Sequence, residues 1–150
     1  MNTDDIAIVL STVDMFAGLS PKVLKRLAES GRVMEAPPGA EIVHAGEPVS
    51  GFRAFSPDGV EMHVILTGTA TVRVNGQVVG TLIADDYFGE LALIDGQPRS
   101  ADVVAGQSGI TTWSLGKLEF DKVVEEHPEV LLPMMKVVVA RLRRAEAAAR

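Results

Sequence analysis

The chain has 150 residues, of which 47% are hydrophobic and 23% charged, the size and balance of one globular domain spanning residues 1–150. It has no cysteine, which excludes disulfides, thiolate metal sites and cysteine nucleophiles. A net charge of -6 argues against sequence-independent binding to nucleic acid, and the acidic N-terminus without a long apolar run predicts a cytoplasmic chain with no membrane span.

Two helices are expected within residues 1–32. Ser20-Pro21 is typical of an N-cap followed by proline at the first helical position, and Gly31 is placed to end that helix as a C-cap. The helix before it is predicted by apolar residues at helical spacing: Ile6, Val9, Leu10, Val13 and Phe16.

Short β-rich runs separated by Gly and Pro turns then fill residues 36–115, a pattern that predicts a mainly β sandwich or barrel. Strands are expected at 41–43, 62–66 and 110–115. Asn75-Gly76 lies between two valine-rich runs, and this pair favours the positive φ angles of a two-residue hairpin turn.

Helical spacing returns over residues 118–150, first at 118–127 and again from Pro128. Pro133 would lie inside the second helix and predicts a break near Leu132. Arginines gather towards the end of the chain, where they complement a helix dipole better than they indicate nucleic-acid binding. One face of this helix is expected to carry Leu131, Met134, Met135, Val138 and Leu142.

The segment from Phe88 to Ile94 predicts a strand that turns through Gly89 into a very short helix. Unsatisfied N–H groups at a helix start favour an anion. A tight turn at 95–98 then delivers Arg99 and Ser100, whose guanidinium and hydroxyl suit phosphate oxygens. Glu90 would repel a phosphate but suits a sugar hydroxyl. The pattern indicates a ligand with both groups, although Glu90 and Arg99 could instead form a simple ion pair.

Residues 88–94, followed by 98–101, Val103 and Ala105, resemble the phosphate-binding cassette of the cyclic nucleotide-binding domain family. That family includes the catabolite activator proteins and the regulatory subunits of cAMP-dependent kinase. The resemblance implies an eight-stranded β jelly roll with N-terminal helices and C-terminal closing helices. It also implies a ligand-binding set made of Phe88, Gly89, Glu90, Leu91, Ala92, Arg99, Ser100, Ala101 and Val103.

The function implied by the resemblance is a regulatory domain that binds a cyclic nucleotide and performs no catalysis. Ser100 favours cAMP over cGMP as the ligand, and no further cofactor is expected. The hypothesis for signalling is that the C-terminal helix moves with Met134, Met135 and Val138, with Leu132 to Pro133 as hinge. The readout would be an effector protein, a parent protein, or a homodimer formed through that helix.

Three departures from the family pattern stand out. Asp102 adds a carboxylate near the expected phosphate, although strand alternation favours an outward direction. Residues 51–61 form an insertion in which Phe52 and Phe55 are core residues or a partner-facing patch. Pro133 interrupts the helix that closes over the base in the family.

Other classes of function are less well supported. A metal-dependent jelly-roll enzyme would need clustered ligands, but His44, His63 and His127 are scattered. A DNA-binding regulator would need a helix-turn-helix after the closing helix, and the sequence stops at Arg150. The remaining alternative is a degenerate jelly roll that binds no nucleotide and serves in dimerisation or docking.

Overall fold

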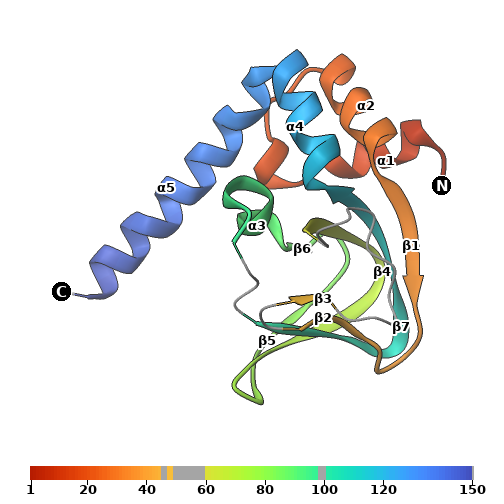
Figure 1. Cartoon of the computed structure of the whole chain (residues 1–150), viewed down its shortest axis with the longest axis vertical. Helices are drawn as coiled ribbons and strands as arrows, with labels where there is room; N and C mark the ends of the chain where they lie inside the picture. Colours follow the sequence, from red (N-terminus) through yellow and green to blue (C-terminus); the bar gives the residue numbers. More distant parts are fainter. Residues whose placement is uncertain (45–46, 49–59, 98–100, 150) are drawn as a thin grey trace. The chain divides into compact units, whose positions relative to one another are not determined.

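The computed structural model describes residues 1–44, 47–48, 60–97 and 101–149 (Figure 1). Two compact units emerge from it. The helical unit combines Met1–Glu29 with Asp121–Arg150, and the sheet unit comprises Ser30–Phe120. No helix in the described ranges is both long enough and apolar enough to cross a membrane.

The helical unit begins with α1 (Thr3–Ser11), the 3-10 helix η1 (Asp14–Phe16) and α2 (Pro21–Ser30). Asn2 and Asp5 form a reciprocal capping box at the start of α1. Ser20 caps α2 as the sequence predicts, since its Oγ accepts a hydrogen bond from the backbone N–H of Val23 at 3.3 Å.

The rest of the helical unit contains most of α4 (Lys117–Glu126), the 3-10 helix η2 (Pro128–Val130) and α5 (Leu131–Ala148). A two-pronged ion pair joins α2 to α4. Arg26 Nε and Nη2 donate to the Glu126 carboxylate at 2.7 and 3.0 Å. This hydrogen-bonded contact raises the pKa of Arg26 and lowers the pKa of Glu126.

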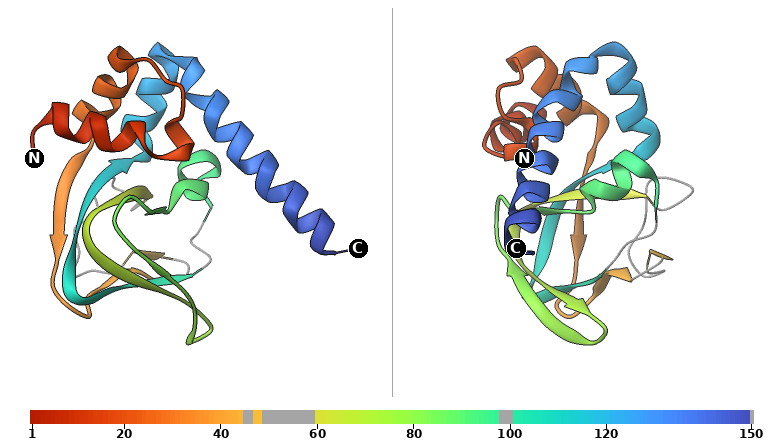
Figure 2. Two further views of the ribbon diagram at one scale, coloured as in Figure 1. Left: turned by 180° about the vertical axis from the view of Figure 1, so that it is seen from behind. Right: turned by 90° about the vertical axis from the view of Figure 1, so that its left-hand side faces the viewer.

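The expected break near Leu132 is wrong. Helix α5 runs continuously from Leu131 to Ala148 (Figure 2). Pro133 lies in its first turn, where a missing N–H removes no helical hydrogen bond, so the chain changes direction earlier, through η2. The predicted apolar face also divides, because Met134 is buried whereas Met135 and Leu142 are exposed.

One antiparallel sheet forms the sheet unit, with the strand order β3-β2-β7-β4-β5, while β1 pairs with β7 and β6 with β4. The described residues hold seven strands where eight were expected. The pairing of β4 with β7 contains two β-bulges. Such bulges bend a long strand while its hydrogen bonding to the neighbouring strand continues on both sides. The strands are β1 (Arg32–Ala36), β2 (Glu41–His44), β3 (Glu47–Pro48), β4 (Glu61–Val74), β5 (Gln77–Leu82), β6 (Tyr87–Phe88) and β7 (Asp102–Gly116).

The predicted hairpin is confirmed between β4 and β5, where Asn75 has φ 52° and Gly76 φ 79°. It extends beyond the rest of the sheet in both Figures 1 and 2. The predicted strands at 41–43, 62–66 and 110–115 lie within β2, β4 and β7. Phe52 and Phe55 of the insertion lie outside the described residues.

Helix α2 ends at Ser30, directly before Gly31, as the sequence predicts, although the φ of Gly31 is not positive. Its role is close packing. A Cβ on Gly31 would lie 2.5 Å from both Trp113 Nε1 and the Ser114 carbonyl oxygen. The absence of a side chain at this position therefore lets the buried Trp113 approach the backbone before β1.

An apolar cluster inside the sheet unit reaches the segment that precedes α3 (Glu90–Asp95). Phe88 packs in this cluster with residues of β2, β4 and β7, including Val43, Ile65 and Val103. The core of the sheet thus fixes the position of the chain where the short helix begins.

Candidate functional site

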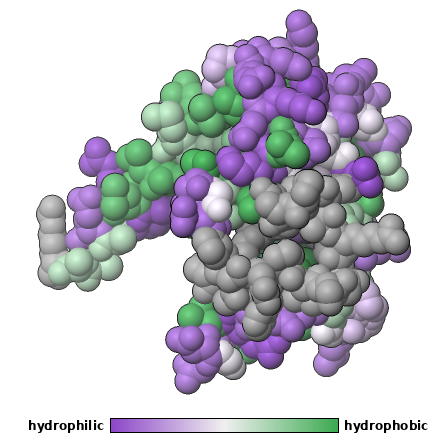
Figure 3. Space-filling model, in the orientation of Figure 1, coloured by the Kyte–Doolittle hydropathy of each residue, from purple (hydrophilic) through white to green (hydrophobic). Residues whose placement is uncertain are grey.

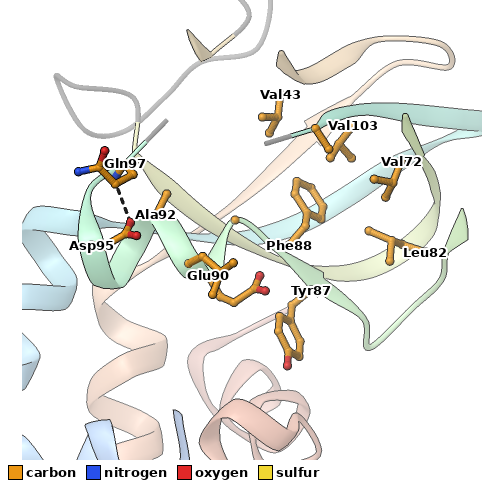
Figure 4. A pocket seen from close by; sticks show the side chains of 13 residues that line it. Val43, Val72, Leu82, Tyr87, Phe88, Glu90, Ala92, Asp95, Gln97 and Val103 are labelled. Carbon is orange, nitrogen blue, oxygen red and sulfur yellow. Dashed lines mark hydrogen bonds between the residues drawn. The ribbon is translucent and has the colours of Figure 1, made fainter. Parts of the chain in front are cut away.

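A pocket of about 360 Å³ opens in the sheet unit beside α3 (Figure 4). This volume is at the lower end of the range of about 300–1,000 Å³ that small-molecule sites occupy. The lining residues come from β2, β4, β5, β6, α3, β7 and the residues next to α3 and β7: Val43, Val72, Leu82, Tyr87, Phe88, Gly89, Glu90, Leu91, Ala92, Asp95, Gln97, Ala101 and Val103.

The chain turns from β6 into α3 at Gly89, which has φ 84° and forms the N-cap. A left-handed conformation of this kind favours glycine, so the predicted strand, glycine and short helix are confirmed. Glu90 follows in the first turn of α3, where a carboxylate interacts favourably with the helix dipole. Only 9% of Glu90 is exposed, although it lines the pocket.

The other end of α3 is held by two local contacts. Gly96 has φ 69°, and its N–H donates to the carbonyl oxygen of Ala92 at 2.7 Å. Lys117 Nζ donates to the carbonyl oxygen of Leu93 at 3.1 Å, placing a cation at the C-terminal end of the helix dipole. These contacts fix the C-terminal end of the six-residue helix.

The pocket has a polar and an apolar side. In Figure 4 Asp95 and Gln97 lie together at the far end of α3, and the Glu90 side chain extends from the start of α3 towards Tyr87. The Asp95 Oδ1 accepts a hydrogen bond from the Gln97 backbone N–H at 2.9 Å. The opposite side gathers Val43, Val72, Leu82, Phe88 and Val103 from the strands. Such a cavity suits a ligand with a polar end and a flat apolar part.

Seven of the nine residues predicted to bind the ligand line this pocket. Arg99 and Ser100 lie outside the described residues. The structure brings together Phe88, Gly89, Glu90, Leu91, Ala92, Ala101 and Val103.

Six further residues line the pocket that were not predicted as ligand-binding residues: Val43, Val72, Leu82, Tyr87, Asp95 and Gln97. The period-2 alternation of β4 places Val72 on one face with Ala70, which is a signal for an inward residue. Asp102 is absent from the pocket lining and lies opposite Arg73 in the β4–β7 register, whereas its neighbours Ala101 and Val103 line the pocket.

A metal site in the described residues would need a cluster of acidic or histidine side chains. Across the described ranges, no group of three or more His, Asp or Glu residues is arranged to hold a metal ion. The described pocket lining likewise includes no Lys or Arg.

Comparisons with known proteins agree on one family. The family model for the cyclic nucleotide-binding domain matches residues 33–127. A Pycsar effector protein of Xanthomonas perforans is 30% identical over 122 residues, which is 81% of this chain and 37% of the relative. A cyclic nucleotide-gated potassium channel of Mesorhizobium japonicum is 31% identical over 140 residues, 93% of this chain and 36% of the channel.

The fold agrees as well. The catabolite activator protein of Thermus thermophilus superposes with a TM-score of 0.74 at 20% identity, covering 91% of this chain and 61% of that one. The chain spans little more than a third of the two curated relatives above. The matched residues include most of the sheet unit, with β6, α3 and the pocket. This chain belongs to the cyclic nucleotide-binding domain family.

Proposed function

We propose that the pocket beside α3 binds a cyclic nucleotide, with cAMP preferred over cGMP, and that the domain uses this binding as a regulatory signal. The proposal is carried by Glu90, an acidic residue that is only 9% exposed and lines a pocket with an apolar side formed by the strands. A buried carboxylate suits a hydroxyl donor such as the ribose 2′-OH, which forms a charge-assisted hydrogen bond.

The remaining roles follow from the chemistry of the ligand. Arg99 supplies the guanidinium that pairs with the cyclic phosphate, and Ser100 adds a hydroxyl donor and carries the preference for cAMP. The aliphatic side formed by Val72, Leu82 and Val103 receives apolar parts of the nucleotide. The described pocket lining contains no Lys or Arg, so this proposal assigns the pairing with the phosphate to Arg99.

Isothermal titration of the purified chain with cAMP and with cGMP tests the proposal. Removing one partner of a buried charged contact costs about 3–5 kcal/mol, so Arg99→Ala is expected to weaken binding at least about a hundredfold. Glu90→Gln keeps an acceptor oxygen and is expected to cost less. Arg32→Ala removes the same charge from β1, away from the pocket lining, and is the matched control.

The outcomes separate the two functional classes. Nucleotide binding that is lost in Arg99→Ala and kept in Arg32→Ala supports a nucleotide sensor. Binding that survives Arg99→Ala refutes the role given to that residue. An absence of heat and of thermal stabilisation with both nucleotides would favour the degenerate docking module instead.

Signal output is proposed to pass through α5, either to an effector or parent protein or to a second copy of the chain. Figure 3 shows apolar surface along this helix. Its exposed apolar side chains follow a three-four spacing, typical of a helix that packs on another helix: Leu132, Met135, Val139 and Leu142. Amide exchange over residues 128–149 that stays unchanged at saturating nucleotide would contradict transmission through α5.

A further inference from the structure

A row of three side chains crosses the sheet and ends at the pocket. In the register, His63 of β4 lies opposite Ser114 of β7 on one side and opposite Phe88 of β6 on the other. Directly opposite residues of neighbouring strands share one face of a sheet. His63 is 3% exposed and Ser114 is fully buried, whereas Phe88 lines the pocket. The row therefore connects the sheet interior to the pocket wall.

Two hydroxyl groups of β7 fix the imidazole of His63. Its Nδ1 lies 2.7 Å from Ser114 Oγ and 3.1 Å from Thr112 Oγ1, and the two hydroxyl oxygens are 3.1 Å apart. Hydroxyl protons rotate to suit either tautomer of the ring, so both arrangements satisfy these atoms. At this buried position the two hydroxyl contacts set the plane of the ring, whereas an aliphatic side chain would form neither hydrogen bond.

The fixed ring supports Phe88. The two ring centroids are 4.9 Å apart and the planes differ by 16°, a stacked arrangement. Strand β6 comprises only Tyr87 and Phe88, and its register with β4 covers two residue pairs. Gly89 follows at once in the left-handed conformation that starts α3. A short ladder needs a side-chain anchor, and the His63–Phe88 stack provides one next to the N-cap of the pocket helix.

We infer that His63 is a positioning residue for the nucleotide pocket: anchored by Ser114 and Thr112, it holds Phe88, and through Phe88 it sets the place of Gly89 and Glu90. His63 is absent from the pocket lining, so it acts without touching the ligand. The inference rests on the proposed function and identifies a residue that prepares the same site. It attributes a binding role to a polar cluster that would otherwise contribute only to folding.

The test measures nucleotide affinity by isothermal titration and unfolding by thermal melts on the same set of variants of the full chain. His63→Leu removes the ring. His63→Phe keeps a flat aromatic surface against Phe88 and loses the hydrogen bonds. Met62→Leu is the matched control, since Met62 is fully buried on the same strand and points to the opposite face.

His63→Leu is expected to weaken nucleotide binding about fivefold, because an aromatic pair contributes on the order of 1 kcal/mol and each 1.4 kcal/mol is tenfold. His63→Phe is expected to weaken binding by about twofold, less than His63→Leu, because it keeps an aromatic face against Phe88 but loses the hydrogen bonds that fix the ring. Met62→Leu is expected to lower the melting temperature without changing the affinity. Equal affinity for His63→Leu and the unmodified chain would overturn the inference.

A double-mutant cycle tests whether His63 works through Phe88. If it does, adding His63→Leu to Phe88→Leu is expected to cause no further loss beyond about twofold. Additive losses would refute the route through Phe88. If the unmodified chain binds nucleotide and the His63 variants bind it equally well, the proposed function stands and only the inference about His63 fails. If the unmodified chain binds neither nucleotide, the proposed function fails and this inference fails with it.

Discussion

The replacement Gly31→Ala tests the packing of the sheet unit most directly. The added Cβ would meet Trp113 Cε2 and lie 2.5 Å from Trp113 Nε1 and from the Ser114 carbonyl oxygen. One of these neighbours is backbone within the β1–β7 ladder, and the other is an indole only 1% exposed, so neither can move cheaply. Gly31 has no positive φ, so the steric contact is the whole effect.

Overpacking of a tight core costs typically 1–3 kcal/mol, and the double contact places Gly31→Ala at about 2 kcal/mol. For a chain of this length that corresponds to a melting temperature lower by about 4–8 °C. Trp113 is the only tryptophan, so its fluorescence reports both the unfolding transition and a displacement of the indole in the folded state. Urea unfolding followed by this emission gives the free energy of unfolding directly.

Gly80→Ala is the control for this experiment. Gly80 lies in β5 without a positive φ, and an added Cβ there would meet nothing within 4 Å. This variant is expected to match or slightly exceed the stability of the unmodified chain, because alanine restricts the unfolded state. If Gly31→Ala unfolds within about 0.5 kcal/mol of the unmodified chain with unchanged emission, the packing argument is wrong.

Three further predictions concern other contacts. The pKa of Glu126 is lowered in the folded state, so its pair with Arg26 stabilises the fold above the unfolded pKa, and this stabilisation is lost as the pH falls through the folded pKa. In Arg26→Met the melting temperature is therefore expected to fall less steeply with pH below about pH 4.5 than in the unmodified chain. Lys117→Met removes the donor to the Leu93 carbonyl and is expected to cost about 1 kcal/mol and to speed amide exchange in α3; unchanged exchange would contradict the capping role. Gly76→Ala places an alanine at φ 79°, where the added Cβ meets no other atom, so backbone strain is the only expected effect. The free energy of unfolding measured with denaturant is expected to fall by about 1 kcal/mol, with unchanged nucleotide affinity.

Local signals in the sequence predicted local structure well. The hairpin could be predicted from Asn75-Gly76 because both residues tolerate the positive φ angles that its turn requires. The start of α3 could be predicted from Gly89 for the same reason, since Gly89 has a positive φ directly before Glu90. The seven cassette residues found around the pocket are close in sequence, so a motif could identify them together.

Long-range relations could not be predicted in this way. Val43, Val72 and Leu82 come from three strands, and only the pairing register shows that they meet. Gly31 is distant in sequence from Trp113, the residue that requires it to be glycine. Pro133 lies inside the last helix as predicted, but the predicted break was wrong. Helical spacing does not fix where a helix begins, and a proline in the first turn is compatible with the helix.

The β4–β7 ladder also determines the order in which the site can assemble. The ladder runs from the pair Arg73–Asp102 to the pair Glu61–Gly116. The pair with the smallest sequence separation, Arg73–Asp102, closes a loop of residues 74–101 that contains β5, β6 and α3. Closing this loop costs entropy before any later pair is formed, which makes it a slow step in folding. The pocket walls on β4 and β7 come together only after that closure, so a ligand that binds the finished pocket stabilises the entire ladder and slows its opening.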